Sequence, residues 1–159
     1  MNNTLIFYLL LLICFISCLI THYINKIKHF IIDSGNTGPT LLLIGGTHGN
    51  EPAGSVALEK FINKNPTISK RKIIIIHRVN KIGLALNIRW GFNGFFPIDY
   101  NRQYPLIDSE ITGDHINRQI IEYVKISDFV VDFHEGWGFN VVEPKSMGSG
   151  IYPSNTILI

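Results

Sequence analysis

The sequence contains few cysteines and few charges, and both shortages limit what the protein can be. Its two cysteines, Cys14 and Cys18, lie in an apolar N-terminal segment, so residues 28–159 contain none. This excludes disulfide bonds and cysteine-type zinc sites in that part of the chain. Charged residues make up 16% of the 159 residues, and the net charge is +2. The charges are scattered except at residues 69–72 ("SKRK"), interpreted as a solvated turn, so no nucleic-acid partner is expected.

The N-terminal segment has no charge, glycine or proline in residues 5–20. With the next four residues this apolar run approaches the roughly 20 residues that cross a bilayer as a helix. We therefore predict that residues 1–27 form a single-pass transmembrane anchor and its flank; a cleaved signal peptide is the alternative. Lys26 and Lys28 follow the run, which favours a membrane protein whose remaining chain is cytoplasmic.

Residues 28–159 have room for one domain, and their pattern alternates between strands and helices. Apolar and β-branched runs predict strands at residues 29–33, 40–46, 72–79 and 128–134. Apolar residues at helical spacing predict helices that start near Asn50 and Asp114, each a candidate N-cap. This order predicts an α/β fold, a three-layer sandwich with a mostly parallel central sheet. Residues 80–112 show no sustained period and are expected to carry functional groups.

Three potential metal ligands follow two of the predicted strands. His48 and Glu51 lie in the glycine-rich segment 45–54 ("GGTHGNEPAG"), and His134 ends the last strand. Since the carboxyl ends of parallel strands meet at one edge of a sheet, the three side chains are expected there together. Two imidazoles and one carboxylate are the ligands of one class of catalytic zinc site. His77 lies in the middle of a strand and is interpreted as a core or rim histidine.

Four segments resemble, in order, the motifs of the zinc carboxypeptidase superfamily: "GGTHGNEPAG", "NKIGLALNIRWGFNG", "IDYNRQYP" and "VVDFHEGWGF". They are most similar to its succinylglutamate desuccinylase and aspartoacylase branch, and the similarity runs from about residue 40 to about residue 153. The resemblance implies a zinc-exopeptidase-like fold. It also implies that one Zn²⁺ per chain is bound by His48, Glu51 and His134.

The same resemblance implies roles for four further residues. Arg89 falls where the family has an arginine that polarises the scissile carbonyl. The segment "DYNR" is similar to the family's Asp-Leu-Asn-Arg, so Asn101 and Arg102 would hold the substrate carboxylate and Asp99 would hydrogen-bond a zinc-binding histidine. Structural salt bridges remain the alternative for the two arginines, and local hydrogen bonding remains the alternative for Asp99 and Asp132.

The general base of the family is a glutamate well downstream of the last zinc ligand, whereas this sequence ends 25 residues after His134. The available carboxylates are those of Glu135 and Glu143. If the strand continues through Glu135, its side chain points to the opposite face of the sheet from that of His134. We therefore expect a C-terminally truncated hydrolase domain without its catalytic glutamate.

Three functions are compatible with these features. The first is a zinc-dependent hydrolase that cleaves the amide bond of an N-acyl amino acid, a small anionic substrate. The second is a zinc carboxypeptidase or murein-peptide hydrolase, which the same constellation would serve. The third is a catalytically inactive, metal-binding remnant that lacks the general base.

Overall fold

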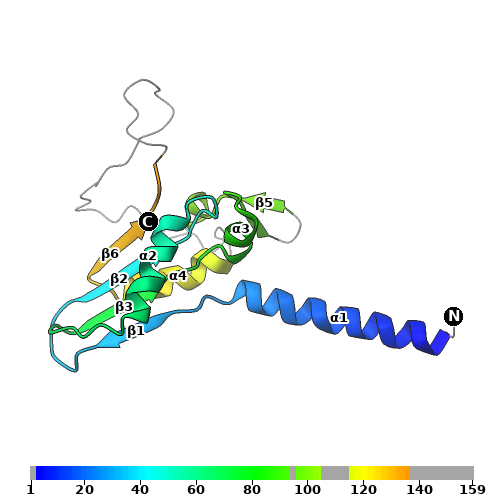
Figure 1. The fold of residues 1–159 in the computed structure, drawn as a ribbon, viewed down its shortest axis with the longest axis horizontal. Helices are drawn as coiled ribbons and strands as arrows, with labels where there is room; N and C mark the ends of the chain where they lie inside the picture. Colours follow the sequence, from blue (N-terminus) through cyan, green and yellow to red (C-terminus); the bar gives the residue numbers. More distant parts are fainter. Residues whose placement is uncertain (1–2, 94–95, 105–114, 137–159) are drawn as a thin grey trace, which may run out of the picture.

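The computed structural model describes residues 3–93, 96–104 and 115–136. Figure 1 shows a long N-terminal helix that projects away from the remaining elements, which pack together. In chain order the elements are α1 (Asn3–Asn25), β1 (Phe30–Asp33), β2 (Thr40–Gly45), α2 (Pro52–Asn63), β3 (Lys72–Ile76), α3 (Lys81–Leu86), β4 (Gly91–Asn93), β5 (Phe96–Ile98), the 3₁₀ helix η1 (Tyr100–Arg102), α4 (His115–Lys125) and β6 (Phe129–Phe133).

The central sheet has four strands in the order β1-β3-β2-β6. Strand β2 runs parallel to both β3 and β6, whereas β1 pairs with β3 in the antiparallel direction. The predicted α/β fold with a mostly parallel sheet is confirmed. The region predicted to lack a sustained period holds short elements instead, among them α3 and the two-stranded ribbon of β4 and β5.

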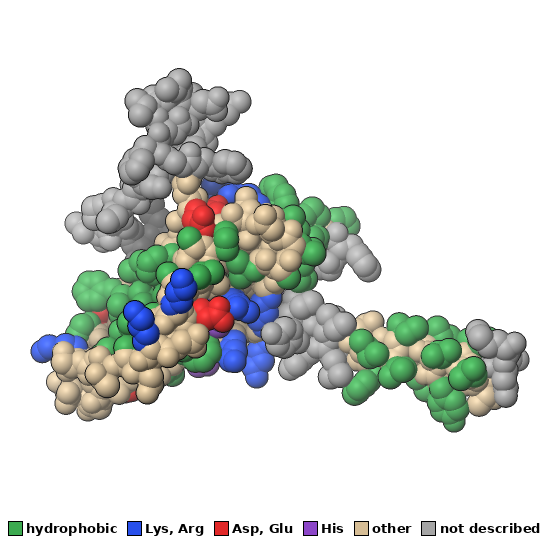
Figure 2. Space-filling view, in the orientation of Figure 1, with side chains coloured by type: hydrophobic (Ala, Val, Ile, Leu, Met, Phe, Trp, Pro, Cys, Tyr) green, Lys and Arg blue, Asp and Glu red, His purple; other side chains and the backbone are tan. Residues whose placement is uncertain are grey.

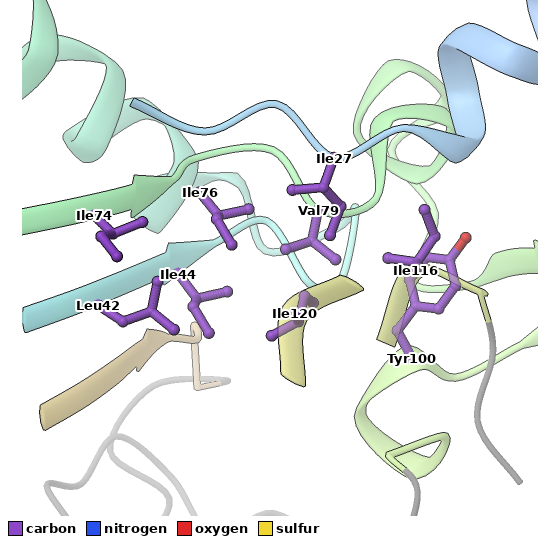
Figure 3. Packing of buried hydrophobic residues seen from close by; sticks show 9 residues of the cluster. All are labelled: Ile27, Leu42, Ile44, Ile74, Ile76, Val79, Tyr100, Ile116 and Ile120. Atoms are coloured by element: carbon purple, nitrogen blue, oxygen red, sulfur yellow. The ribbon is translucent and has the colours of Figure 1, made fainter. Parts of the chain in front are cut away.

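Helices cover both faces of this sheet (Figure 1). On one face Leu42 and Ile44 of β2 pack in one cluster with Ile120 of α4, and Figure 3 shows these side chains converging. On the other face α2 lies against β2 and β6, and Gly54 of α2 is close to Phe133. The alternation of side chains along β2 sends Leu42 and Ile44 to one face, so the strand separates the two helical layers. His77 is buried, as predicted for a core or rim position.

The predicted transmembrane anchor is wrong. Helix α1 forms as a helix, but within the described residues no helix combines the length and the apolar character that a bilayer crossing requires. The uninterrupted apolar run, residues 5–20, rises only about 24 Å as a helix, less than the roughly 30 Å of hydrocarbon. Figure 2 shows hydrophobic side chains along α1 interspersed with other atoms. The predictions of an anchor in residues 1–27, of a membrane localisation and of a membrane partner are therefore all wrong.

The loop after β2 fits only because Gly49 has no side chain. A Cβ on Gly49 would lie 1.9 Å from the carbonyl carbon of Gly83 in α3, which is far inside van der Waals contact. We expect Gly49→Ala to lower the free energy of unfolding by about 2–3 kcal/mol, because two backbone segments must separate. Urea denaturation measures this change.

Gly35→Ala is the control for this substitution. Gly35 has open space around its Cα but a φ of +73°, so alanine there is expected to cost only about 1 kcal/mol. Equal losses for Gly49→Ala and Gly35→Ala would contradict the close contact between the loop and α3.

Candidate metal centre

The candidate site is built on the turn that follows β2. Gly46 has a φ of +72°, a left-handed conformation that glycine adopts without strain. The backbone N–H of Asn80 donates to the carbonyl of Gly46 at 2.8 Å, which fixes the turn against the start of α3. The N–H of Glu51 then donates to the carbonyl of His48 at 3.2 Å. This turn brings the side chains of His48 and Glu51 to the same side of the chain.

The three predicted ligands meet at this point. The Nδ1 atom of His48 lies 2.9 Å from Oε1 of Glu51, and Nδ1 of His134 lies 2.8 Å from Oε2 of the same carboxylate. One ligand atom from each residue lies within 4.8 Å of the other two, so the group could hold a metal ion. His48 and Glu51 are buried, while His134 at the end of β6 is more exposed. The site therefore opens to solvent on the His134 side.

Each imidazole is hydrogen-bonded, through the ring nitrogen that does not face Glu51, to a second carboxylate. Nε2 of His48 lies 2.9 Å from Oδ1 of Asp99, and Nε2 of His134 lies 3.1 Å from Oδ2 of Asp132. The hydroxyl of Thr47 donates to Asp132 at 3.2 Å and holds it in place. A carboxylate on one ring nitrogen fixes the orientation of the ring and makes the other nitrogen a better metal ligand. Two imidazoles and one carboxylate so arranged fit a zinc ion.

Arg89 joins this cluster from the segment between α3 and β4. Its Nε and Nη2 atoms donate to Oδ2 of Asp99 at 3.1 and 2.9 Å, and its Nη1 donates to Oε1 of Glu51 at 3.1 Å. The side chain of Arg89 is one-third exposed. The guanidinium thus bridges two carboxylates of the cluster and still reaches solvent.

Asn101 and Arg102 lie beside Asp99 in η1. The N–H of Asn101 donates to Oδ1 of Asp99 at 2.9 Å, and the exposed Arg102 donates from Nη1 to the carbonyl of Asn101 at 2.9 Å. Within the described ranges, no hydrogen bond joins the guanidinium of Arg102 to His48 or Glu51. The role of Asn101 and Arg102 in substrate binding stays a prediction.

The charges of the cluster are mutually stabilised. Burial favours a higher pKa for Glu51, but the hydrogen bond from His134 and the charge of His48 outweigh it and lower the pKa. Burial likewise opposes ionisation of Asp99, yet His48 and Arg89 hold the pKa of its carboxyl below the ordinary value. The hydrogen bond to Asp132 raises the pKa of His134 to about 9, with Glu51 adding to the effect and burial opposing it. The cluster thus favours the ionised carboxylates of Glu51 and Asp99 and the protonated imidazole of His134.

Glu135 lies beyond the last strand. Because β6 ends at Phe133, the alternation of side chains that would send Glu135 to the opposite face from His134 does not apply to it. Its carboxylate accepts a hydrogen bond from the backbone N–H of Ala53, in the first turn of α2.

Helix α2 has Glu51 at its N-cap position, so the prediction of Asn50 as the cap is wrong. Glu143, the other candidate base, lies outside the described residues.

A pocket of about 410 Å³ adjoins the cluster. Its lining residues come from the start of α2, from the end of α3 and from the segment after β6: Asn50, Glu51, Asn87, Glu135 and Gly136. Since Glu51 is one of these residues, the pocket reaches one of the three potential metal ligands.

A mostly parallel sheet with a His₂Glu group at the carboxyl ends of its strands defines an α/β protein with a potential catalytic metal site. The chain belongs to the succinylglutamate desuccinylase/aspartoacylase family, whose catalytic-domain model matches residues 37–138. The resemblance inferred from the four sequence motifs is thereby confirmed. No curated protein matches the chain.

Solved structures support the same family. The product-bound ectoine utilization protein from Ruegeria pomeroyi is 28% identical, with a TM-score of 0.55 over 69% of this chain and 33% of that one. An aspartoacylase family protein from Mesorhizobium loti is 25% identical, with a TM-score of 0.57 over 70% and 35%. The product-bound cell shape determinant protein from Helicobacter pylori shares the fold at 24% identity, with a TM-score of 0.58 over 76% and 31%. The chain therefore spans about a third of the length of these structures.

Proposed function

We propose that the protein binds one zinc ion per chain through His48, Glu51 and His134 and hydrolyses the amide bond of an N-acyl amino acid. The observation that carries this proposal is the convergence of three donor groups within 4.8 Å, with a carboxylate behind each imidazole. The family match supports the reaction class, because the matching model describes a catalytic domain of deacylating enzymes.

A zinc ion held by His48, Glu51 and His134 would act as a Lewis acid on the amide carbonyl and lower the pKa of the attacking water. The protein's own groups then have separate tasks. Asp99 and Asp132 orient the imidazoles of His48 and His134. Arg89 is anchored by Asp99 and Glu51, and it retains N–H groups that can donate to the oxygen of the scissile carbonyl as charge develops there.

Recognition of the substrate falls to η1. Arg102 is exposed and follows Asp99 by three residues at the end of η1, and we infer that its guanidinium can turn toward the site. A guanidinium binds a carboxylate through two parallel hydrogen bonds, which suits the free carboxylate of an N-acyl amino acid. Asn101 would add an amide donor beside it.

Hydrolysis assays with N-acyl aspartates and N-succinylglutamate test the proposal on the zinc-loaded chain. We expect Arg89→Ala to lower kcat by about 10²–10³-fold, since it removes a donor to the developing oxyanion. Arg78→Ala is the matched control, because Arg78 is an exposed arginine that pairs with Glu59 outside the cluster. If Arg89→Ala and Arg78→Ala have equal kcat values, the role of Arg89 is wrong.

Short peptides form the second arm of the same assay, since a zinc exopeptidase would use the same ligands and the same arginine. Release of a C-terminal residue from peptides, with no deacylation, would replace the proposed substrate class. Zinc binding without hydrolysis in either arm would support the metal-binding remnant.

A further inference from the structure

The start of α2 lacks the cap that a helix usually has. The side chain of Glu51, at the N-cap position, makes no hydrogen bond to the first turn. Residues at this position usually accept a hydrogen bond from the second or third helical N–H. The carboxylate of Glu51 is instead engaged by His48 and His134. Its position as a potential metal ligand therefore leaves the helix without a cap from its own segment.

Glu135 supplies this cap from a distant part of the chain. Its carboxylate accepts from the N–H of Ala53, 82 residues earlier in the sequence. Pro52 has no N–H, so Ala53 offers the first backbone donor within the helix. A carboxylate at a helix N-terminus is further stabilised by the helix dipole.

A second hydrogen bond runs in the opposite direction. The backbone N–H of Glu135 donates to Oε2 of Glu51 at 3.1 Å, and this oxygen is the one that Nδ1 of His134 approaches at 2.8 Å. Residues 134 and 135 thus hold the 51–53 segment at two points. One point is the carboxylate of Glu51, and the other is the first turn of the helix that bears it.

We propose that Glu135 is a positioning residue that sets the metal affinity of the site by locking the first turn of α2, and with it Glu51, against His134. This inference rests on the proposed function, because it requires that Glu51 and His134 bind the ion. Glu135 lies beside Glu51 in the lining of the same pocket, but its carboxylate is held by the helix. Glu135 therefore acts through Glu51.

Two substitutions of Glu135 distinguish the effect of its side-chain length from the effect of its charge. Glu135→Gln keeps the length and a carbonyl oxygen that can accept from Ala53, but removes the charge. Glu135→Asp keeps the charge but is one methylene shorter, so its carboxylate falls short of the Ala53 N–H. Glu59→Ala is the matched control, since Glu59 is an exposed glutamate of α2 that pairs with Arg78 away from the first turn.

Zinc affinity of the full chain, measured by competition with a chromophoric chelator, is the first readout. We expect Glu135→Asp to weaken binding by about tenfold or more, as for other residues that orient metal ligands. Glu135→Gln is expected to retain the affinity to within about threefold, because the hydrogen bond to Ala53 survives. The visible spectrum of the Co²⁺-loaded chain is expected to change in the Asp variant and to match wild type in the Gln variant.

Amide hydrogen exchange of Ala53 in the metal-free chain is the second readout. Faster exchange is expected in Glu135→Asp but not in Glu135→Gln or Glu59→Ala. If Glu135→Asp speeds exchange yet leaves zinc affinity and the Co²⁺ spectrum unchanged, Glu135 is only a helix cap and the inference is overturned.

An equal loss of zinc affinity in Glu135→Asp and Glu135→Gln would overturn the inference as well. A wild-type chain that binds no zinc would instead refute the proposed function, a result that the wild-type measurement alone reveals.

Discussion

Replacing Glu51 with alanine is expected to abolish zinc binding, with a loss of affinity of about 10²-fold or more. Among the residues that the structure describes, Glu51 is the one that hydrogen-bonds to both candidate histidine ligands, through different oxygens of its carboxylate. Its removal leaves two imidazoles without the carboxylate that neutralises the ion and spaces the rings. Elemental analysis of zinc per chain, together with chelator competition, measures the effect.

The variant Glu51→Gln separates the loss of the negative charge from the loss of the side chain. The amide keeps the shape of the side chain and one acceptor oxygen, but it lacks the negative charge that pairs with Arg89 at 3.1 Å. We expect Gln to retain the fold better than Ala while still losing most of the metal. Glu59→Ala on the same helix should bind zinc like wild type, because Glu59 pairs with Arg78 at the surface. Full zinc occupancy in Glu51→Ala would show that the metal site lies elsewhere.

Zinc affinity is expected to rise about tenfold per pH unit between about pH 7 and pH 9. The cause is the protonation state of His134, whose pKa is raised to about 9 by Asp132 and Glu51. A metal ion must displace this proton before Nδ1 can become a ligand, so each unit of pH below 9 costs a factor of about ten. Chelator competition at a series of pH values measures the slope.

The stability of the metal-free chain is expected to change in the opposite direction. A histidine with a raised pKa in the folded state stabilises the fold fully below its ordinary value of 6.5. That contribution is lost as the pH rises through about 9. Asp132→Asn removes the largest cause of the shift, so it should move both transitions toward lower pH. A zinc affinity independent of pH from 7 to 9 would contradict the protonated state of His134.

Local patterns were sufficient for the sheet. The β-branched run of β3 and the apolar run of β2 predicted strands that the structure contains, because such runs are stable only when both faces are covered. The alternating order of strands and helices predicted the mostly parallel sheet, because helices that connect parallel strands cover the faces of such a sheet. The short elements between Lys81 and Arg102 were not predicted, since their few residues give no measurable period and tertiary contacts decide their conformation.

The N-terminal helix shows where composition misleads. An apolar run predicts a helix, and α1 is one, but a membrane crossing depends on the continuous apolar length, a stricter property. The cap of α2 shows a similar limit. Asn50 has a favourable residue type for capping, whereas the actual cap bond comes from Glu135, which no local pattern connects to Ala53.

The sequence by itself determined the family, the α/β class and the types of side chain available for a metal site. Each depends on residues close together in the chain or on the order of motifs. The motifs also predicted that the three potential metal ligands lie together and that Asp99 hydrogen-bonds a zinc-binding histidine. Only the tertiary structure decided the other contacts: it placed Asp132 behind His134, Arg89 between two carboxylates, and Glu135 at the start of α2. The longest of these contacts joins residues 82 positions apart, and its geometry follows from strand register and helix packing, which no local spacing encodes.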